Sequence, residues 1–117
     1  MKRLRTRPDY LAVAKGVRVV RLGFVLQARP RQERAGEPRF GFTASRKTGT
    51  AVVRNRIRRR LKELARAGAP SAPEGIDFVL IGRREAAGRD FATMAGELQS
   101  AFADASRSRR QRRPEAN

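Results

Sequence analysis

The chain has 117 residues, of which 39% are hydrophobic and 33% are charged, and this length and composition suit one small domain with a thin core. Lys and Arg number 28 against 11 Asp and Glu, and the net charge of +17 predicts a polyanionic partner, with nucleic acid ahead of an anionic membrane. The chain has no His and no Cys, and its acids are scattered singly, so a self-sufficient enzyme and a thiolate metal site are disfavoured classes.

The N-terminal region predicts a basic arm followed by a short helix. Residues 1–5 form the arm, which we expect to fray. Thr6 is placed as an N-cap and Gly16 as a C′ residue, so a helix is predicted over residues 7–15. The apolar side of this helix carries Tyr10, Val13 and Ala14.

Two alternating segments follow. Residues 17–29 alternate with period two, which predicts an extended strand that Gly23 divides into two. One face of that strand carries Val20, Leu22, Phe24, Leu26 and Ala28. The polar, turn-rich segment 30–38 predicts a hairpin loop, and a second strand follows over residues 39–45. One side of this second strand carries Phe40, Phe42 and Ala44, and core packing is the simplest interpretation of such apolar faces.

The segment 41–66 predicts the central element of the chain. A tight turn at Thr48 and Gly49 precedes a helix from about Ala51, with Thr50 as its N-cap. One stripe of this helix is apolar, as in a helix that packs on a core, and consists of Val53, Ile57, Leu61 and Leu64. The opposite face carries Asn55, Arg59, Lys62 and Arg66, flanked by Arg56 and Arg58.

Little in this segment balances the basic face, because Glu63 is the only acid between Arg46 and Arg66. Exposed helices normally interleave both signs, since like charges three or four residues apart repel one another. An ordinary solvated face is one interpretation of the charge. The other is a phosphate-binding face, for which arginine is suited because its planar fork can bond two oxygens.

The remainder of the chain predicts a loop over residues 68–75, a central strand over residues 76–81 and a final helix over residues 90–105. The core stripe of that helix consists of Phe91, Met94, Leu98 and Phe102. We therefore expect one domain over residues 1–106 and a basic disordered tail over residues 107–117. The order of elements predicts an α+β sandwich with helices packed on one mixed sheet.

The basic helix and its approach resemble the protein component of bacterial ribonuclease P. The resemblance rests on GFTASRK at residues 41–47, then Gly49, AVV at 51–53, Arg-Asn-Arg at 54–56, Arg-Arg at 58–59 and Leu61, all at the family's spacing. It is close over about residues 41–66 and looser from residue 5 to residue 83. It implies a ribosomal protein S5 domain 2-like fold with a left-handed βαβ crossover, an exception to the right-handed rule.

The resemblance also implies two RNA-binding surfaces. The surface for the catalytic RNA would comprise Arg46, Lys47, Arg54, Asn55, Arg56, Arg58, Arg59, Lys62 and Arg66. A cleft for the 5′ leader of precursor tRNA would comprise Tyr10, Val13, Ala14, Phe24 and Phe42. Ala14 stands where the family has a second aromatic residue, which removes part of the cleft's stacking surface.

As implied by the resemblance, the protein would be the non-catalytic subunit of an endoribonuclease that gives mature tRNA 5′ ends. Hydrolysis would fall to the RNA subunit and its Mg²⁺ ions, so we expect no activity of the protein alone. The expected complex has one protein monomer per RNA. No apolar run approaches the roughly 20 residues of a membrane span and no secretory signal is present, so the cytoplasm is expected.

Two other classes share some of these features. A ribosomal or other structural RNA-binding protein would have the same charge and a small α+β domain. A helix-turn-helix DNA-binding protein would also place a basic helix on phosphates, but a partner helix joined by a short turn is not predicted before Ala51.

Overall fold

The structure is a computed structural model that describes residues 1–33 and 35–111, with side chains as far as residue 107. The helices are α1 (Arg7–Ala14), α2 (Ala51–Gly68) and α3 (Phe91–Gln111). The strands are β1 (Lys2–Arg3), β2 (Val17–Val20), β3 (Phe24–Pro30), β4 (Arg39–Ala44) and β5 (Ile76–Gly82). Three short 3-10 helices, η1 (Arg46–Thr48), η2 (Ala69–Ser71) and η3 (Arg84–Ala87), complete the predicted α+β order.

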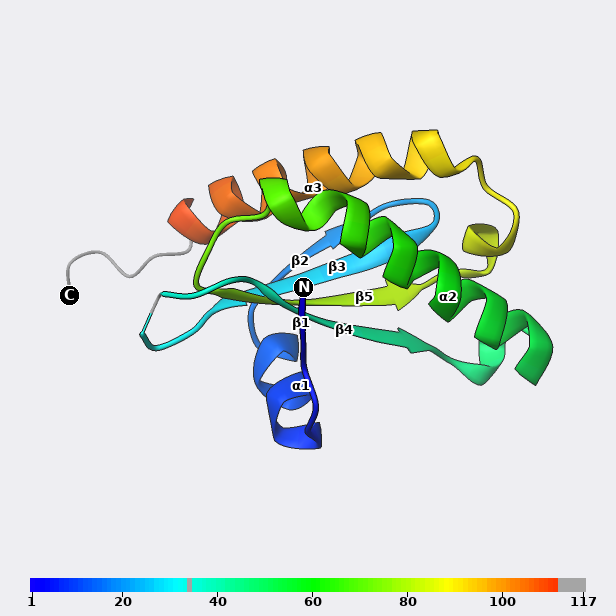
Figure 1. The fold of residues 1–117 in the computed structure, drawn as a ribbon, viewed down its shortest axis with the longest axis horizontal. Coiled ribbons are helices and arrows are strands. Elements are labelled where there is room, and N and C mark those ends of the chain that lie inside the picture. Colours follow the sequence, from blue (N-terminus) through cyan, green and yellow to red (C-terminus); the bar gives the residue numbers. More distant parts are fainter. Residues whose placement is uncertain (34, 112–117) are drawn as a thin grey trace.

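One mixed sheet of five strands organises the molecule, in the order β1-β4-β5-β3-β2. The central strand β5 is parallel to β4 and antiparallel to β3. Helix α2 joins the parallel neighbours β4 and β5, which is the expected βαβ unit. Helix α1 lies on one face of the sheet and α2 and α3 lie on the other, so the fold has three layers (Figure 1).

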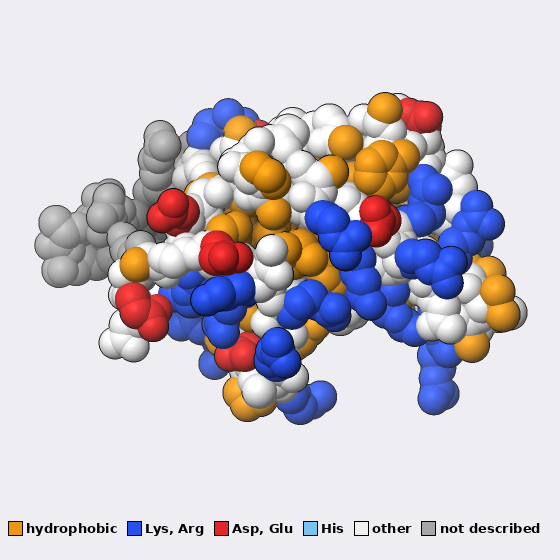
Figure 2. All heavy atoms as spheres, viewed as in Figure 1, with side chains coloured by type: hydrophobic (Ala, Val, Ile, Leu, Met, Phe, Trp, Pro, Cys, Tyr) orange, Lys and Arg blue, Asp and Glu red, His pale blue; other side chains and the backbone are white. Residues whose placement is uncertain are grey.

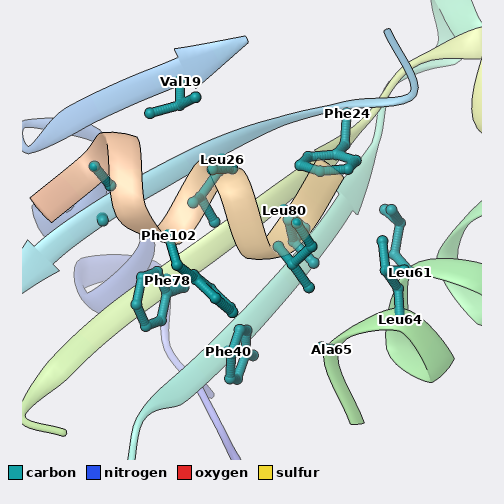
Figure 3. Close-up of a cluster of buried hydrophobic side chains, with 14 of the residues drawn as sticks. Val19, Phe24, Leu26, Phe40, Leu61, Leu64, Ala65, Phe78, Leu80 and Phe102 are labelled. Carbon is teal, nitrogen blue, oxygen red and sulfur yellow. The ribbon is translucent and has the colours of Figure 1, made fainter. Parts of the chain in front are cut away.

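The larger core lies between the sheet and the pair α2 and α3 (Figure 3). Phe40 of β4 stacks on Phe78 of β5 with ring centroids 5.2 Å apart, and Phe102 of α3 lies 5.0 Å from Phe78. Fully burying such side chains stabilises the fold by roughly 1.5 to 3 kcal/mol each. The smaller cluster under α1 consists of Leu4, Val13 and Val79, with Tyr10 and Ile81 packed against it.

Local signals at the helix starts are confirmed. The Thr50 hydroxyl accepts a hydrogen bond from the Val53 amide at 3.3 Å, and the Thr6 hydroxyl accepts one from the Asp9 amide at 3.3 Å. Gly49 has φ +146°, a conformation that side chains disfavour, as expected for the tight turn before α2. Ile57, Leu61 and Leu64 are buried, with Val53 half-buried at the end of their stripe.

Gly16 follows helix α1 as predicted, but the reason for a glycine at this position is not the left-handed conformation that is usual after a helix. Gly16 is not among the glycines with positive φ. A Cβ atom at this position would lie 2.0 Å from the carbonyl oxygen of Ala28, so a close approach of two backbone segments requires the glycine.

The prediction that residues 1–5 fray is wrong. Lys2 and Arg3 form β1, which pairs in parallel with β4, and the Leu4 amide donates to the Phe40 carbonyl at 2.9 Å. Leu4 is only 3% exposed and fills the cluster under α1. A single apolar residue among basic ones therefore fixes this segment to the sheet edge.

The predicted hairpin at residues 30–38 is also wrong, because β5 lies between β3 and β4 and pairs with both. The division at Gly23 is confirmed, yet the chain reverses there, with the Arg21 amide donating to the Phe24 carbonyl at 2.8 Å. This reversal shifts the phase of β2, so Val20 and Leu22 are 51% and 46% exposed while Phe24, Leu26 and Ala28 are buried as expected.

The final helix differs from its prediction at both ends. Met94, Leu98 and Phe102 are buried, but Phe91 is 38% exposed in the first turn. The helix continues to Gln111, so residues 107–111 of the predicted disordered tail are helical. Residues 112–117 lie outside the described part of the chain.

Candidate nucleic-acid interface

The predicted RNA-binding residues lie together on η1 and on the side of α2 that faces away from the core. Those exposed to solvent are Arg46, Lys47, Asn55, Arg56, Arg59 and Arg66, while Arg54, Arg58 and Lys62 are half-buried. Figure 2 shows Lys and Arg side chains gathered over the region of α2. We call this set of residues the α2 basic face.

The α2 basic face has almost no internal counter-charge. Within the described residues its one ion pair joins Arg66 to Glu63, at 2.6 Å. Arg58 donates a hydrogen bond to the Asn55 side-chain oxygen, which holds one guanidinium without neutralising it. The face therefore concentrates positive charge that an external polyanion would stabilise.

Arginines elsewhere are paired more often. Arg21 contacts Asp104 at 2.5 Å and Arg89 contacts Glu97 at 2.7 Å, so each of these two arginines faces a carboxylate of α3. These contacts lower the pKa of the Asp104 and Glu97 carboxyls, chiefly through the hydrogen bonds from Arg21 and Arg89. The arginines of α2 are less often paired with acids than these arginines are. This difference, and not the net charge of the chain alone, makes α2 the candidate site.

Arg60 is the one arginine of α2 outside the predicted set, and its role is structural. Its guanidinium donates to the Arg89 carbonyl and so ties α2 to the loop before α3. Arg83, which directly follows β5, donates to the Arg21 carbonyl at 2.9 Å and braces the turn between β2 and β3.

The predicted leader-cleft residues do not form one surface. Tyr10 and Val13 lie on the α1 face of the sheet, while Ala14 is exposed on α1. Phe24 and Phe42 belong to the core on the opposite face, at 0% and 7% exposed, with Arg3 above the Phe42 ring. Their inclusion in the cleft was wrong, because side chains that alternate along a strand point to opposite faces.

Tyr10 is held against β4 by two contacts. A Cβ atom on Gly41 would lie 2.5 Å from the Tyr10 ring, so the glycine leaves room for the ring on the sheet. The Phe42 amide donates to the Tyr10 hydroxyl at 3.2 Å, on the edge of β4 beyond the end of β1. The half-buried phenol therefore has a structural role while part of it stays open to solvent.

A row of side chains crosses the same sheet face beside Tyr10. The strand register aligns Val20 with Val25, Val25 with Ile81, and Ile81 with Thr43. Val20 is exposed, Ile81 and Thr43 are half-buried and Val25 is buried. Sequence alternation could not have found this row, because it placed Val20 on the face of Phe24, opposite to that of Val25.

The far end of this face is closed by an ion cluster around Asp77. Its carboxylate accepts bonds from Arg31 at 2.8 Å and from Arg39 at 2.8 and 2.6 Å. Burial alone would raise the Asp77 pKa, but the hydrogen bonds from Arg39 and Arg31 outweigh it and the pKa is lowered. Glu33 lies 3.9 Å from Arg31 and Asp9 lies 3.9 Å from Arg39, so a second acid faces each arginine of the cluster.

Across residues 1–33 and 35–111, no group of three acidic side chains is placed to hold a metal ion. No helix in the same part of the chain is long and apolar enough to cross a bilayer.

Comparisons with known proteins identify the family of this chain. The sequence model of the family described as Ribonuclease P matches residues 1–106. Proteins named Ribonuclease P protein component from Gluconacetobacter diazotrophicus and Erythrobacter litoralis are 46% and 43% identical over 99 and 102 residues. These alignments cover 83% and 85% of this chain, and 84% and 81% of the relatives.

Solved structures show the same architecture. The RNase P protein from Thermotoga maritima superposes with a TM-score of 0.73 at 30% identity, covering 87% of this chain and 96% of that one. An RNase P protein mutant of Staphylococcus aureus with defective mRNA degradation activity gives 0.74 at 25% identity, covering 89% and 87%. With the family model matching most of its length, the chain belongs to the ribonuclease P protein family.

Proposed function

We propose that this subunit of ribonuclease P binds the catalytic RNA through the α2 basic face and the leader of precursor tRNA along the α1 face of the sheet. The observation that carries the first assignment is the run of basic side chains on α2 that has, among the described residues, a single ion pair to an acid. Family membership favours this function over a ribosomal or other structural RNA-binding role.

The protein contributes binding and position, not bond cleavage. Phosphodiester hydrolysis is assigned to the RNA subunit and its Mg²⁺ ions, which stabilise charge on the attacking and leaving oxygens. Basic side chains on α2 lessen repulsion between RNA segments, so the metal sites of the RNA fill at lower Mg²⁺. One protein monomer would serve one RNA, and precursor tRNA as substrate places this work in the cytoplasm.

The leader surface is supported by Tyr10 and by the row of Val20, Val25, Ile81 and Thr43. An aromatic edge and a partly apolar sheet surface can receive bases without reading them, since every base has an apolar face. Phosphate contacts position a nucleic acid without specifying sequence. Such a surface accepts leaders of different sequence.

Reconstitution with the cognate RNA subunit tests this function. The wild-type protein should raise precursor tRNA cleavage at low Mg²⁺, and RNA-free protein should not cleave at any Mg²⁺ concentration. Arg59→Glu with Lys62→Glu should weaken RNA-subunit binding and flatten its salt dependence by roughly 0.7 to 0.9 log units per lost phosphate contact. Unchanged affinity and slope with an intact fold would show that the α2 basic face is only a solvated surface.

A further inference from the structure

Val52 is the most exposed of the large hydrophobic residues in the described part of the chain, at 78%. It occupies the first turn of α2, next to Ala51, which is also exposed. Neither burial nor helix propensity explains a valine here, because β-branched residues are poorer helix formers than the Lys, Arg or Glu usual at exposed positions.

The position of Val52 on the helix is informative. Residues three, four and seven positions apart share one side of an α-helix, so Val52 lies in line with Asn55, Arg56 and Arg59. The buried stripe of Ile57, Leu61 and Leu64 is on the other side. Val52 thus lies beside the α2 basic face at the start of α2, and the core cannot be its partner.

We propose that Val52 contacts an unpaired nucleotide of the RNA subunit, packing its two methyl groups on a base or ribose face. This inference rests on the proposed function, because the neighbouring charge is what selects the partner. Arg56 and Arg59 beside it form no ion pair with an acid among the described residues, which favours a polyanion over an apolar protein surface.

The chemistry of RNA indicates which kind of nucleotide Val52 would contact. A paired A-form helix presents mainly phosphates and 2′-hydroxyls, with its base faces stacked inside. Loops and bulges splay out bases whose faces an apolar side chain can cover. The α2 basic face would therefore recognise RNA shape at its Val52 end and phosphate charge along the rest of its length.

Val52→Ala is the direct test, measured as affinity for the RNA subunit over a range of salt concentrations. The variant should bind roughly 3- to 15-fold more weakly, the loss expected when two methyl groups leave a partly or fully buried contact. Its salt slope should equal that of the wild type, because an apolar contact releases no counterions. Its melting temperature should not fall, since alanine is the better helix former.

Two comparison variants separate a failure of the proposed Val52 contact from a failure of the proposed function of α2. Leu11→Ala truncates another exposed side chain, 51% exposed on α1, and should leave affinity for the RNA subunit unchanged. Arg59→Gln should weaken binding and also flatten the salt slope by roughly 0.7 to 0.9. Normal binding by Val52→Ala with a weakened Arg59→Gln overturns the Val52 contact alone, whereas normal binding by both overturns the proposed function of α2.

A photo-crosslinking amino acid in place of Val52 identifies the nucleotide. Cross-links confined to unpaired nucleotides of the RNA subunit are expected. Cross-links to paired stems only, to another protein, or none in the assembled complex would overturn the assignment.

Discussion

Asp77 shows how one buried carboxylate can hold two strands, β5 and β4, and the loop after β3. It accepts hydrogen bonds from Arg31 and Arg39, and Arg31 also donates to the carbonyls of Ala35 and Glu37 at 2.5 and 3.0 Å. Asp77→Asn removes the charge that both arginines face. We expect the free energy of unfolding at pH 7 to fall by about 3 kcal/mol, the cost of breaking a largely buried pair.

The pH dependence of Asp77 has a defined sign. Its folded-state pKa is lower than the ordinary value of 3.8, so its contribution is complete above that pH and is lost as pH falls through the folded pKa. Denaturant unfolding between pH 7 and pH 2 should show a shallower acid loss in Asp77→Asn than in the wild type. Asp9→Asn is the control, because Asp9 lies 3.9 Å from Arg39 and is more exposed; an equal effect of both variants would contradict the prediction.

Glu63 is the single acid on the α2 basic face, and its removal should strengthen RNA binding. Glu63→Gln releases Arg66 from its ion pair and removes one repulsive charge. Affinity for the RNA subunit should rise and the salt slope should steepen by up to about 0.9, the value for one added phosphate contact. Both side chains are more than half exposed, so the stability cost should stay below roughly 0.5 kcal/mol.

Glu74→Gln makes the same change of charge at an exposed site before β5, away from α2. It should affect RNA binding less than Glu63→Gln. Equal gains from the two variants would mean that net charge, not the pairing of Arg66, sets the affinity.

The sequence could predict the roles of residues whose hydrogen-bond partners lie close to them along the chain. The caps Thr50 and Thr6 bond amides three positions ahead, and both were found from residue type and position. The bond between the Phe42 amide and the Tyr10 hydroxyl spans 32 positions, and no periodicity reports such a contact. The exposure of Val52 likewise needed the helix to be placed against its sheet.

At the scale of elements, α3 contains a glycine that the packing does not require. A Cβ atom on Gly96 would meet no atom within 4 Å. Gly96→Ala should therefore raise the free energy of unfolding by about 0.5 to 1 kcal/mol, because alanine restricts the unfolded chain and favours helix. Denaturant midpoints with an unchanged m-value would measure the gain.

Gly16 is the matched control for Gly96. Its Cβ would collide with the backbone of Ala28, so Gly16→Ala should destabilise the protein while Gly96→Ala stabilises it. If both variants lower the midpoint, the space beside Gly96 is not free in solution.

Periodicity in the sequence predicted the helices and strands themselves, but it did not predict the order of the strands in the sheet. Alternation assigned inward and outward faces to β3 and β4, since the period of a strand is two. It carried no information on which strand lies between them, so β5 was missed as the partner of both and a hairpin was expected at residues 30–38. The parallel pairing of β4 and β5 came from the family resemblance.

At the scale of the whole molecule, the missing information on how the elements pack also explains the error in the predicted leader cleft. Phe24 and Phe42 were grouped with Tyr10 as aromatic and apolar residues, but the sheet separates them. The two proposed RNA-binding surfaces accordingly lie on opposite faces, with α1 on one and α2 on the other (Figure 1). Surfaces separated by a rigid sheet and sharing no side chain should act independently.

This independence gives a test of the whole arrangement. Tyr10→Ala should weaken precursor tRNA binding to the assembled holoenzyme by about 1 to 3 kcal/mol, the range for stacking on an aromatic. The loss should lie near the lower end, because Ala14 supplies no second ring and is itself exposed. Affinity for mature tRNA should not change, since it has no leader. Arg59→Gln should weaken assembly with the RNA subunit instead.

The double variant Tyr10→Ala with Arg59→Gln should show the sum of the two losses within about 0.5 kcal/mol, when assembly and precursor binding are measured separately. Tyr10→Phe separates the ring from its hydroxyl: it should keep the leader affinity and lose about 1 kcal/mol of stability, because the Phe42 amide loses its acceptor. Equal losses for precursor and mature tRNA in Tyr10→Ala, together with a lower melting temperature, would show that Tyr10 only anchors α1 to β4, and the leader would then have to bind elsewhere on the molecule.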